Sequence, residues 1–310
     1  MKVQWTGVYP AITTKFTEDD QLDIPLFEKN LKFQLEAGIE GVIIGGTLGE
    51  ATALLDDEKK TLTESALRTV GDKIPVVVNI AEQTTREAIR QAQLAEKNGA
   101  HGLMLLPPMR YKATDEETVT YFKAIANATS LPIMIYNNPV DYKILVTLDM
   151  FQELSECPNI EAVKESTRDL TNITRMRNKF GDRFKIMGGV DTLALESALL
   201  GADGLVAGLV CAFPKETVAI FNLAKVGRLE EALSIYRWFM PLCELDIDPQ
   251  LVQNIKLAEV YVGLGSENVR APRLKLSGER RKEVIKIIED SLATRPELPD
   301  YLNLDKSILA

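Results

Sequence analysis

The sequence predicts an α/β protein, a (β/α)₈ TIM barrel with a C-terminal helical extension. Up to about residue 206, eight short apolar segments alternate with longer segments of helical periodicity. The short segments are rich in Val, Ile and Leu, as expected for parallel strands that are buried on both faces. No G-x-G-x-x-G phosphate loop follows the first strand, and this favours a closed barrel over an open doubly wound sheet.

The predicted strands and helices follow one another along the chain. The eight strands are expected at residues 7–12, 41–44, 75–79, 102–106, 132–136, 160–164, 184–187 and 204–207. Between the first two, Leu26, Phe33 and Ala37 share one face of a predicted helix over 26–36. Three acidic residues at 56–58 open the next helix, at the end that the helix dipole makes positive.

Three helix-to-strand joints repeat one pattern. In each, a glycine suited to a left-handed helix cap (Gly38, Gly99 or Gly201) is followed three residues later by a glycine that begins a strand. The pattern is a weak internal repeat that indicates equivalent βα units.

The strand pattern stops near residue 214. Helical patterns follow at 216–225, 229–245, 249–262 and 279–293, without a flexible linker before them. We therefore expect a barrel over residues 1–225 and an extension over 226–310 that packs on the barrel and is not an independent domain.

Composition narrows the classes of function. The chain has 310 residues and a formal net charge of -9, and an acidic balance argues against binding nucleic acid. No apolar run of about 20 residues is present to span a membrane, and no signal peptide is recognisable, so we expect a cytoplasmic protein. Three scattered cysteines and a single histidine, His101, predict neither a disulfide framework nor a metal site.

The active site of such a barrel lies at the carboxyl ends of the strands. Lys164 ends the sixth predicted strand and is expected to point into the cavity, where low polarity favours the neutral amine that attacks a carbonyl carbon. The alternative is a surface lysine paired with an acid.

Other candidates follow neighbouring strands. Tyr136 ends the fifth strand and could relay protons, although a strand tyrosine can equally be core packing. Thr47 could hydrogen-bond the Tyr136 hydroxyl. The Gly-rich turn offers the backbone N–H groups of Gly45, Gly46 and Gly49 to an anion such as a substrate carboxylate. Asn138 and Gly189 are further candidates because they follow the fifth and seventh strands.

Together these elements resemble the dihydrodipicolinate synthase/N-acetylneuraminate lyase family. The Gly-rich turn ending in Gly49-Glu50, the Tyr136-Asn137-x-Pro139 element and the Val163-Lys164-Glu165 element have the family's order and spacing, and the resemblance covers about residues 5–293. It implies a Schiff-base lysine at Lys164, a proton relay through Tyr136 supported by Thr47, and carboxylate binding by the Thr47-Leu48 backbone. It also implies a homo-oligomer, a tetramer built as a dimer of dimers.

The sequence departs from the synthase pattern at three points. Where synthases carry an arginine that holds the second substrate's carboxylate, this chain has Asp141. Where they carry a relay tyrosine after the fourth strand, this chain has Arg110, with Tyr111 one position later. The usual second threonine of the Gly-rich turn is Leu48. By position, Arg110, Tyr111, Asp141 and Tyr142 are candidate pocket residues, and the alternative for each is a place at an interface or on the surface.

The sequence segments at 103–107, 135–139, 236–241 and 262–273 resemble those of the 1-pyrroline-4-hydroxy-2-carboxylate deaminase subgroup. This resemblance implies a deaminase that forms 2,5-dioxopentanoate and ammonia in hydroxyproline breakdown, with a 2-oxo or 2-imino acid as substrate. No metal or organic cofactor is expected, because the lysine iminium itself is the electron sink. The alternatives are a pyruvate-dependent class I aldolase, a dehydratase of 2-keto-3-deoxy sugar acids, and a non-catalytic carboxylate sensor.

Overall fold

The computed structural model describes residues 1–108 and 111–304. Its eight strands are all parallel and lie in the order β1-β8-β7-β6-β5-β4-β3-β2. They are β1 Gly7–Pro10, β2 Val42–Ile44, β3 Val76–Ile80, β4 Gly102–Leu105, β5 Ile133–Asn137, β6 Ile160–Glu165, β7 Lys185–Gly188 and β8 Gly204–Ala207. A parallel bridge between Ala11 and Ile43 joins β1 to β2 and closes the barrel.

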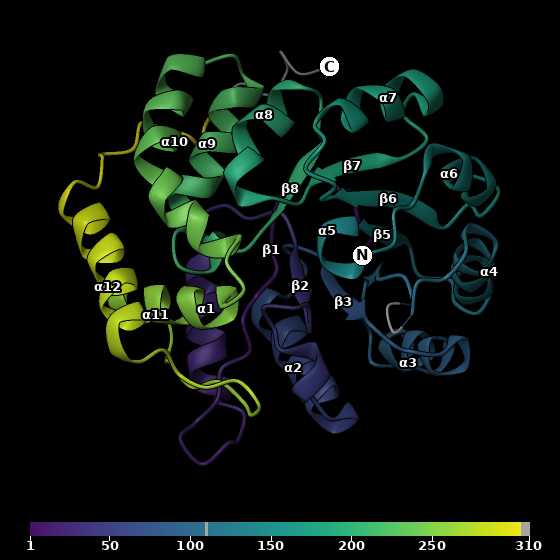
Figure 1. Cartoon of the computed structure of the whole chain (residues 1–310), viewed down its shortest axis with the longest axis horizontal. Coiled ribbons are helices and arrows are strands. Elements are labelled where there is room, and N and C mark those ends of the chain that lie inside the picture. Colours follow the sequence, from purple (N-terminus) through teal and green to yellow (C-terminus); the bar gives the residue numbers. More distant parts are fainter. Residues whose placement is uncertain (109–110, 305–310) are drawn as a thin grey trace.

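Helices surround this ring of strands (Figure 1). They are α1 Ile24–Glu36, α2 Asp56–Val70, α3 Thr85–Lys97, α4 Asp115–Ala126, α6 Leu148–Leu154, α7 Thr171–Phe180, α8 Ala194–Leu199 and α9 Pro214–Lys225. A one-turn helix, α5 (Pro139–Tyr142), follows β5 directly. The predicted (β/α)₈ fold is confirmed, and the strands lie within two residues of the predicted positions.

The apolar pattern explains why these segments form the barrel. All residues of β2, β3, β4, β5 and β8 are buried, since one face packs inside the barrel and the other beneath the helices. The first glycine of each repeated joint has a positive φ, between 86° and 99°, as the left-handed cap requires.

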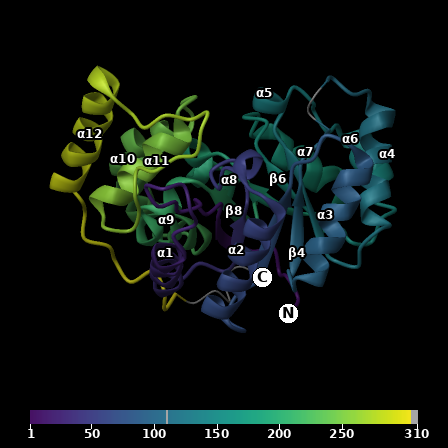
Figure 2. The same cartoon turned by 90° about the horizontal axis from the view of Figure 1, so that it is seen from below.

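The extension consists of α10 (Leu229–Cys243), α11 (Leu251–Tyr261) and α12 (Gly278–Ala293), and it lies on one side of the barrel (Figure 2). Helix α10 packs on α9, with Phe213 making edge contacts with Trp238 and Phe239 at 6.2 and 5.7 Å between ring centroids. A short 3₁₀ turn, η4 (Glu244–Asp246), links α10 to the loop before α11. The predicted domain boundary at residue 225 stays a prediction.

Over residues 1–108 and 111–304, no helix combines the length and the apolar character needed to cross a membrane.

Candidate active site

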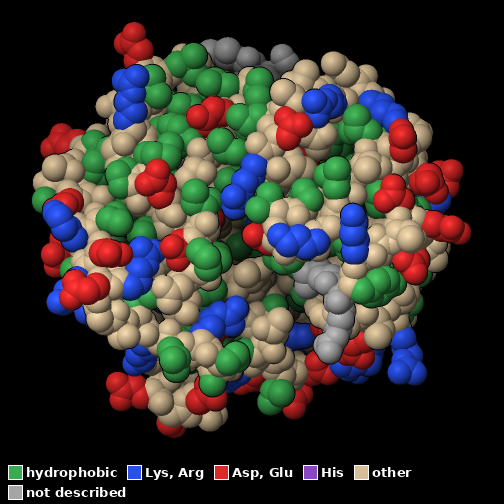
Figure 3. All heavy atoms as spheres, in the orientation of Figure 1, with side chains coloured by type: hydrophobic (Ala, Val, Ile, Leu, Met, Phe, Trp, Pro, Cys, Tyr) green, Lys and Arg blue, Asp and Glu red, His purple; other side chains and the backbone are tan. Residues whose placement is uncertain are grey.

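The loops at the carboxyl ends of the strands surround a cavity of about 260 Å³. The space-filling view shows a hollow near the centre of the molecule, where the strands lie in Figure 1 (Figure 3). Of the residues predicted from sequence, those that line the cavity are Gly46, Thr47, Leu48, Tyr136, Asn138, Asp141, Tyr142, Lys164 and Gly189. Residues of the C-terminal extension complete its wall.

Lys164 occupies β6 beside Tyr136 of β5, its partner in the parallel register. The residue is 7% exposed, and its Nζ atom lies 4.1 Å from the centroid of the Tyr136 ring. Within the described parts of the chain, this Nζ has neither a hydrogen-bond acceptor nor an ion-pair partner. Burial lowers the pKa of Lys164, against the opposing charges of Tyr142 and three aspartates. The neutral amine required for carbonyl addition is therefore more available than in an exposed lysine.

Gly189 provides the space that this lysine occupies. A Cβ atom at Gly189 would lie 2.0 Å from Ser166 Oγ and 2.8 Å from Lys164 Cγ, which is too close for either contact. The Ser166 hydroxyl donates a hydrogen bond to the Gly189 carbonyl at 3.1 Å. The geometry gives Gly189 a steric role beside the lysine.

Tyr136 is a buried phenol whose oxygen accepts a hydrogen bond from Asn138 Nδ2 at 3.2 Å. Burial raises its pKa to about 12, so the hydroxyl keeps its proton at neutral pH and can donate it. Asn138 also donates to the Asp141 carboxylate at 2.7 Å, and Asn138 caps the short helix α5. One amide side chain thus orients both the phenol and an acidic residue of the cavity wall.

The predicted hydrogen bond between Thr47 and Tyr136 is wrong. The Thr47 hydroxyl lies 2.7 Å from the hydroxyl of Tyr142, at the end of α5. The Tyr142 ring meets the Tyr136 ring edge to face, with centroids 5.3 Å apart. Because α5 folds back immediately after β5, it places Tyr142 beside Thr47, and sequence order alone does not reveal this fold-back. Tyr142 lines the cavity and is a further candidate for the relay.

The Gly-rich turn after β2 faces the cavity with Gly46, Thr47 and Leu48. Among the described residues, the amides of Thr47 and Leu48 donate to no protein acceptor, so both can bind a carboxylate. Gly49 does not line the cavity. Its α-carbon packs against the backbone of Gly45 and Ile12, where a Cβ would lie at 3.1 Å, and it serves to keep the turn compact.

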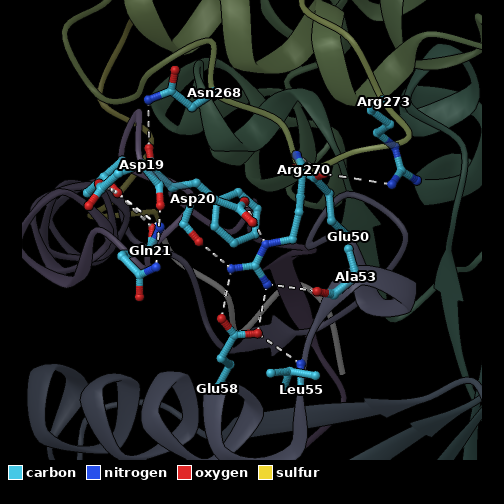
Figure 4. Close-up of polar contacts among 12 residues, drawn as sticks. Asp19, Asp20, Gln21, Glu50, Ala53, Leu55, Glu58, Asn268, Arg270 and Arg273 are labelled. Carbon is cyan, nitrogen blue, oxygen red and sulfur yellow. Dashed lines mark hydrogen bonds and ion pairs between the residues drawn. The ribbon is translucent and has the colours of Figure 1, made fainter.

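The extension holds this turn from behind. Glu50, which ends the turn with a φ of 54°, is fully buried and receives Lys256 Nζ at 2.5 Å and the Arg270 amide at 3.0 Å. The Arg270 guanidinium lies between Asp20, Ala53 O and Glu58, as Figure 4 shows. The turn beside the cavity is therefore fixed by the Lys256 side chain and the Arg270 backbone amide, each more than 200 residues away in sequence.

Sequence reasoning selected only one of the four described acidic residues that share this cavity, Asp141. Asp191, Asp246 and Asp248 line it together with Asp141. Asp191 follows β7, so its position at a strand end was a usable signal. Asp246 and Asp248 belong to η4 and the loop after it, and no pattern in the barrel segment points to them.

Of the two residues predicted after β4, the structure describes only Tyr111. Tyr111 is 56% exposed and is not part of the cavity wall. Arg110 lies outside the described residues. The predicted contribution of Tyr111 is not supported by its position in a single chain.

A closed (β/α)₈ barrel with a buried, unpaired lysine beside a buried tyrosine has the architecture of class I lyases, which react through a lysine nucleophile. The comparisons with known proteins agree with this class. The model of the Dihydrodipicolinate synthetase family matches residues 4–291, and the chain belongs to that family. It is accordingly an enzyme of the class I aldolase type that acts on small molecules.

Relatives of similar length match most of this chain in sequence. The 4-hydroxy-tetrahydrodipicolinate synthase of Exiguobacterium sibiricum is 32% identical over 273 residues, covering 87% of this chain and 91% of the relative. The 4-hydroxy-tetrahydrodipicolinate synthase of Kosmotoga olearia is 31% identical over 288 residues, covering 92% of this chain and 97% of the relative.

Solved structures agree. The chloride-inhibited dihydrodipicolinate synthase of Acinetobacter baumannii, complexed with pyruvate, superimposes with a TM-score of 0.89 at 26% identity, over 93% of this chain and 99% of that one. The dihydrodipicolinate synthase of Aquifex aeolicus superimposes with a TM-score of 0.87 at 26% identity, over 92% of this chain and 97% of that one. A monomeric dihydrodipicolinate synthase variant also matches, with a TM-score of 0.87, and the predicted tetramer stays a prediction.

Proposed function

We propose that this protein is a Schiff-base deaminase that converts 1-pyrroline-4-hydroxy-2-carboxylate to 2,5-dioxopentanoate and ammonia. The observation that carries the proposal is the charge of the cavity wall. Among the described residues, four aspartates line the cavity, at 141, 191, 246 and 248, against two cations, Lys164 and Arg168. Asp248 is paired with Arg280 at 2.9 Å, and Asp191 and Asp246 share one proton, so Asp141 and the Asp191–Asp246 pair carry the negative charge that faces the cavity. Such a wall suits a substrate that bears one carboxylate and develops an amine.

The substrate's single carboxylate fits the turn after β2, where the amides of Thr47 and Leu48 have no protein acceptor. This places C2 toward Lys164. The neutral amine of Lys164 adds to C2, and ring opening leaves a lysine-bound iminium with a free amino group at C5. The negatively charged aspartates of the cavity wall then attract this amino group.

The later steps use the same iminium as the electron sink. Removal of a C3 proton by a bound water gives the enamine, and loss of the C4 hydroxyl as water gives a conjugated species. Tautomerisation produces an imine at C5, and its hydrolysis releases ammonia. Hydrolysis at Lys164 then releases 2,5-dioxopentanoate, so that one water is consumed overall.

A pyruvate-dependent synthase is the second candidate, and the names of the relatives favour it. Its second substrate would have to bring an anionic group beside Asp141 and beside the pair Asp191–Asp246, which carries one negative charge. Like charges in a cavity of low polarity repel strongly, and this is the reason to place the deaminase first.

The test incubates the purified protein separately with 1-pyrroline-4-hydroxy-2-carboxylate and with pyruvate. Release of ammonia and 2,5-dioxopentanoate that disappears in Lys164→Ala would support the deaminase. Pyruvate trapped on Lys164 by borohydride, with no ammonia from the pyrroline, would refute the deaminase and favour an aldolase. A carboxylate sensor without Schiff-base chemistry would show neither reaction.

A further inference from the structure

Two carboxyl groups that the steps above leave unused meet at the edge of the cavity. Asp191 begins the 3₁₀ turn η2 (Asp191–Leu193) after β7, and Asp246 ends η4 in the C-terminal extension. Both line the cavity that contains Lys164. The barrel and the extension thus each contribute one acid to the same site.

The contacts of the two acids differ. The Asp191 oxygens accept hydrogen bonds from the amides of Gly208 and Leu209, each at 2.9 Å. Asp246 receives no backbone amide among the described residues. Its carboxyl group packs on Gly208, where a Cβ atom would lie 2.2 Å from Asp246 Oδ1, and it is hydrogen-bonded to Asp191. Gly208 therefore permits the close approach of the two acids.

These contacts decide which acid holds a proton. Two carboxyl groups in hydrogen-bond contact cannot both ionise cheaply, and they share one proton. Burial raises the pKa of Asp191, but the amides of Gly208 and Leu209 oppose that shift and favour its charged form. Burial, followed by the charge of Asp191, raises the pKa of Asp246 well above its ordinary value. Asp246 is thus the member of the pair that holds the shared proton.

Other ionisable groups face Asp246 as well. Lys164 lowers its pKa, whereas Asp141 raises it, and the Cys243 thiol on α10 lies close by. The pKa of that thiol is itself raised well above the ordinary value by burial, so it contributes no charge. The proton on Asp246 is therefore set mainly by burial and by Asp191.

We propose that Asp246 is the general acid that protonates the departing C4 hydroxyl, with Asp191 as its positioning residue. This inference rests on the proposed deaminase function. The electron pair of the lysine-bound enamine forms the C3–C4 double bond as the C4–O bond breaks. The Asp246 proton passes to the leaving oxygen, water departs, and the Asp246 carboxylate regains a proton from solvent.

As a general acid, Asp246 acts in the dehydration step alone. Formation of the Schiff base and loss of the C3 proton involve Lys164 and the groups around it, and they do not require an acid at position 246. The dehydration step does require it, because hydroxide is a poor leaving group without protonation. A variant at position 246 should therefore separate these steps.

The test compares wild type, Asp246→Asn and the control Glu244→Gln, which changes an exposed acid of the same short turn outside the cavity. For Asp246→Asn, we expect ammonia release from 1-pyrroline-4-hydroxy-2-carboxylate to fall on the order of 100-fold or more. Borohydride trapping of pyruvate on Lys164, and deuterium exchange at C3 of 1-pyrroline-2-carboxylate, which lacks the hydroxyl, should persist. Glu244→Gln should match wild type.

The pH dependence gives a second readout. The wild-type rate should fall as the pH rises through the raised pKa of Asp246, and this limb should be missing from the residual activity of Asp246→Asn. Asp246→Ser repeats the comparison with a smaller side chain if the amide variant does not fold.

Three outcomes would overturn the inference, and each has a different meaning. Ammonia release within about threefold of wild type in Asp246→Asn would show that Asp246 is not the acid. Loss of trapping and exchange together with ammonia release would show a structural role. If wild type traps pyruvate but releases no ammonia, the proposed function itself fails, and the inference fails with it.

Discussion

Lys164 and Lys256 are buried lysines of one molecule that differ in what their amines contact. Lys256 is fully buried, and its Nζ lies 2.5 Å from the Glu50 carboxylate and 2.6 Å from the Asn268 carbonyl. The Nζ of Lys164 lies over the Tyr136 ring without an ion-pair partner among the described residues. Burial lowers the pKa of both, that of Lys256 to about 8. The contacts of the two amines, and not their burial, separate the anchoring lysine from the proposed nucleophile.

The position of each lysine follows from what its amine contacts. An amine that is already bound to a carboxylate cannot approach a substrate carbon, but it can join distant segments. Lys256 joins the extension to the turn that carries Thr47 and Leu48. Lys164 needs open space in front of Nζ, and the cavity provides it. Lys15 repeats the anchoring arrangement with Glu259 at 2.5 Å.

The largest expected effect is on the nucleophile. Lys164→Ala should lower kcat for the physiological substrate by on the order of 10⁴-fold or more, because the covalent route is lost. Steady-state assays and mass spectrometry after borohydride treatment measure turnover and labelling. Lys286→Ala, on the exposed face of α12, is the matched control and should retain both. Substantial turnover without Lys164 would place the nucleophile elsewhere.

The next effect is on stability. Lys256→Met should lower the free energy of unfolding by about 3–5 kcal/mol, because the buried Glu50 would lose its nearest cation and keep, among the described residues, only Arg273 at 3.7 Å. Urea denaturation measures the change. Lys286→Met, whose partner Asp290 is exposed, should change it by less than about 1 kcal/mol. If Lys256→Met lowers the free energy of unfolding no more than Lys286→Met does, the Lys256–Glu50 pair does not anchor the turn. A double variant with Glu50→Gln should recover part of the loss.

The smallest effect is on the pH dependence of Lys164. The pKa of this lysine is lowered by burial from 10.5, and the charge of Asp191 opposes that shift. Trapping of pyruvate should therefore rise with pH through a midpoint below 10.5. Asp191→Asn should move this midpoint to lower pH, by on the order of one unit or less. A midpoint that moves upward would mean that Asp191 does not act on Lys164 through its charge.

Much of the site was predictable because it depends on local order. Strand ends of a barrel meet at one rim, so residues that follow successive strands share a cavity once the strands are located. Lys164, Tyr136 and the turn at 46–48 were found in this way. Gly49 follows the same turn but supports the backbone, and sequence spacing does not distinguish a packing glycine from a binding one.

Residues that depend on long-range packing were missed. Thr47 meets Tyr142 and not Tyr136 because α5 folds back over the cavity. Tyr111 lies on the surface although it follows a strand. Asp246 reaches the cavity only because α10 packs on α9 and ends in η4 beside Gly208.

The sequence by itself determined the alternation of strands and helices, the barrel, and a lysine at the end of β6. These follow from apolar periodicity and chain order, which act over a few residues. The tertiary structure alone decided which lysine lacks a carboxylate partner and which acids face it. Those properties depend on contacts between segments far apart in the chain, such as Glu50 with Lys256 and Asp191 with Asp246, and burial and charge act through those contacts.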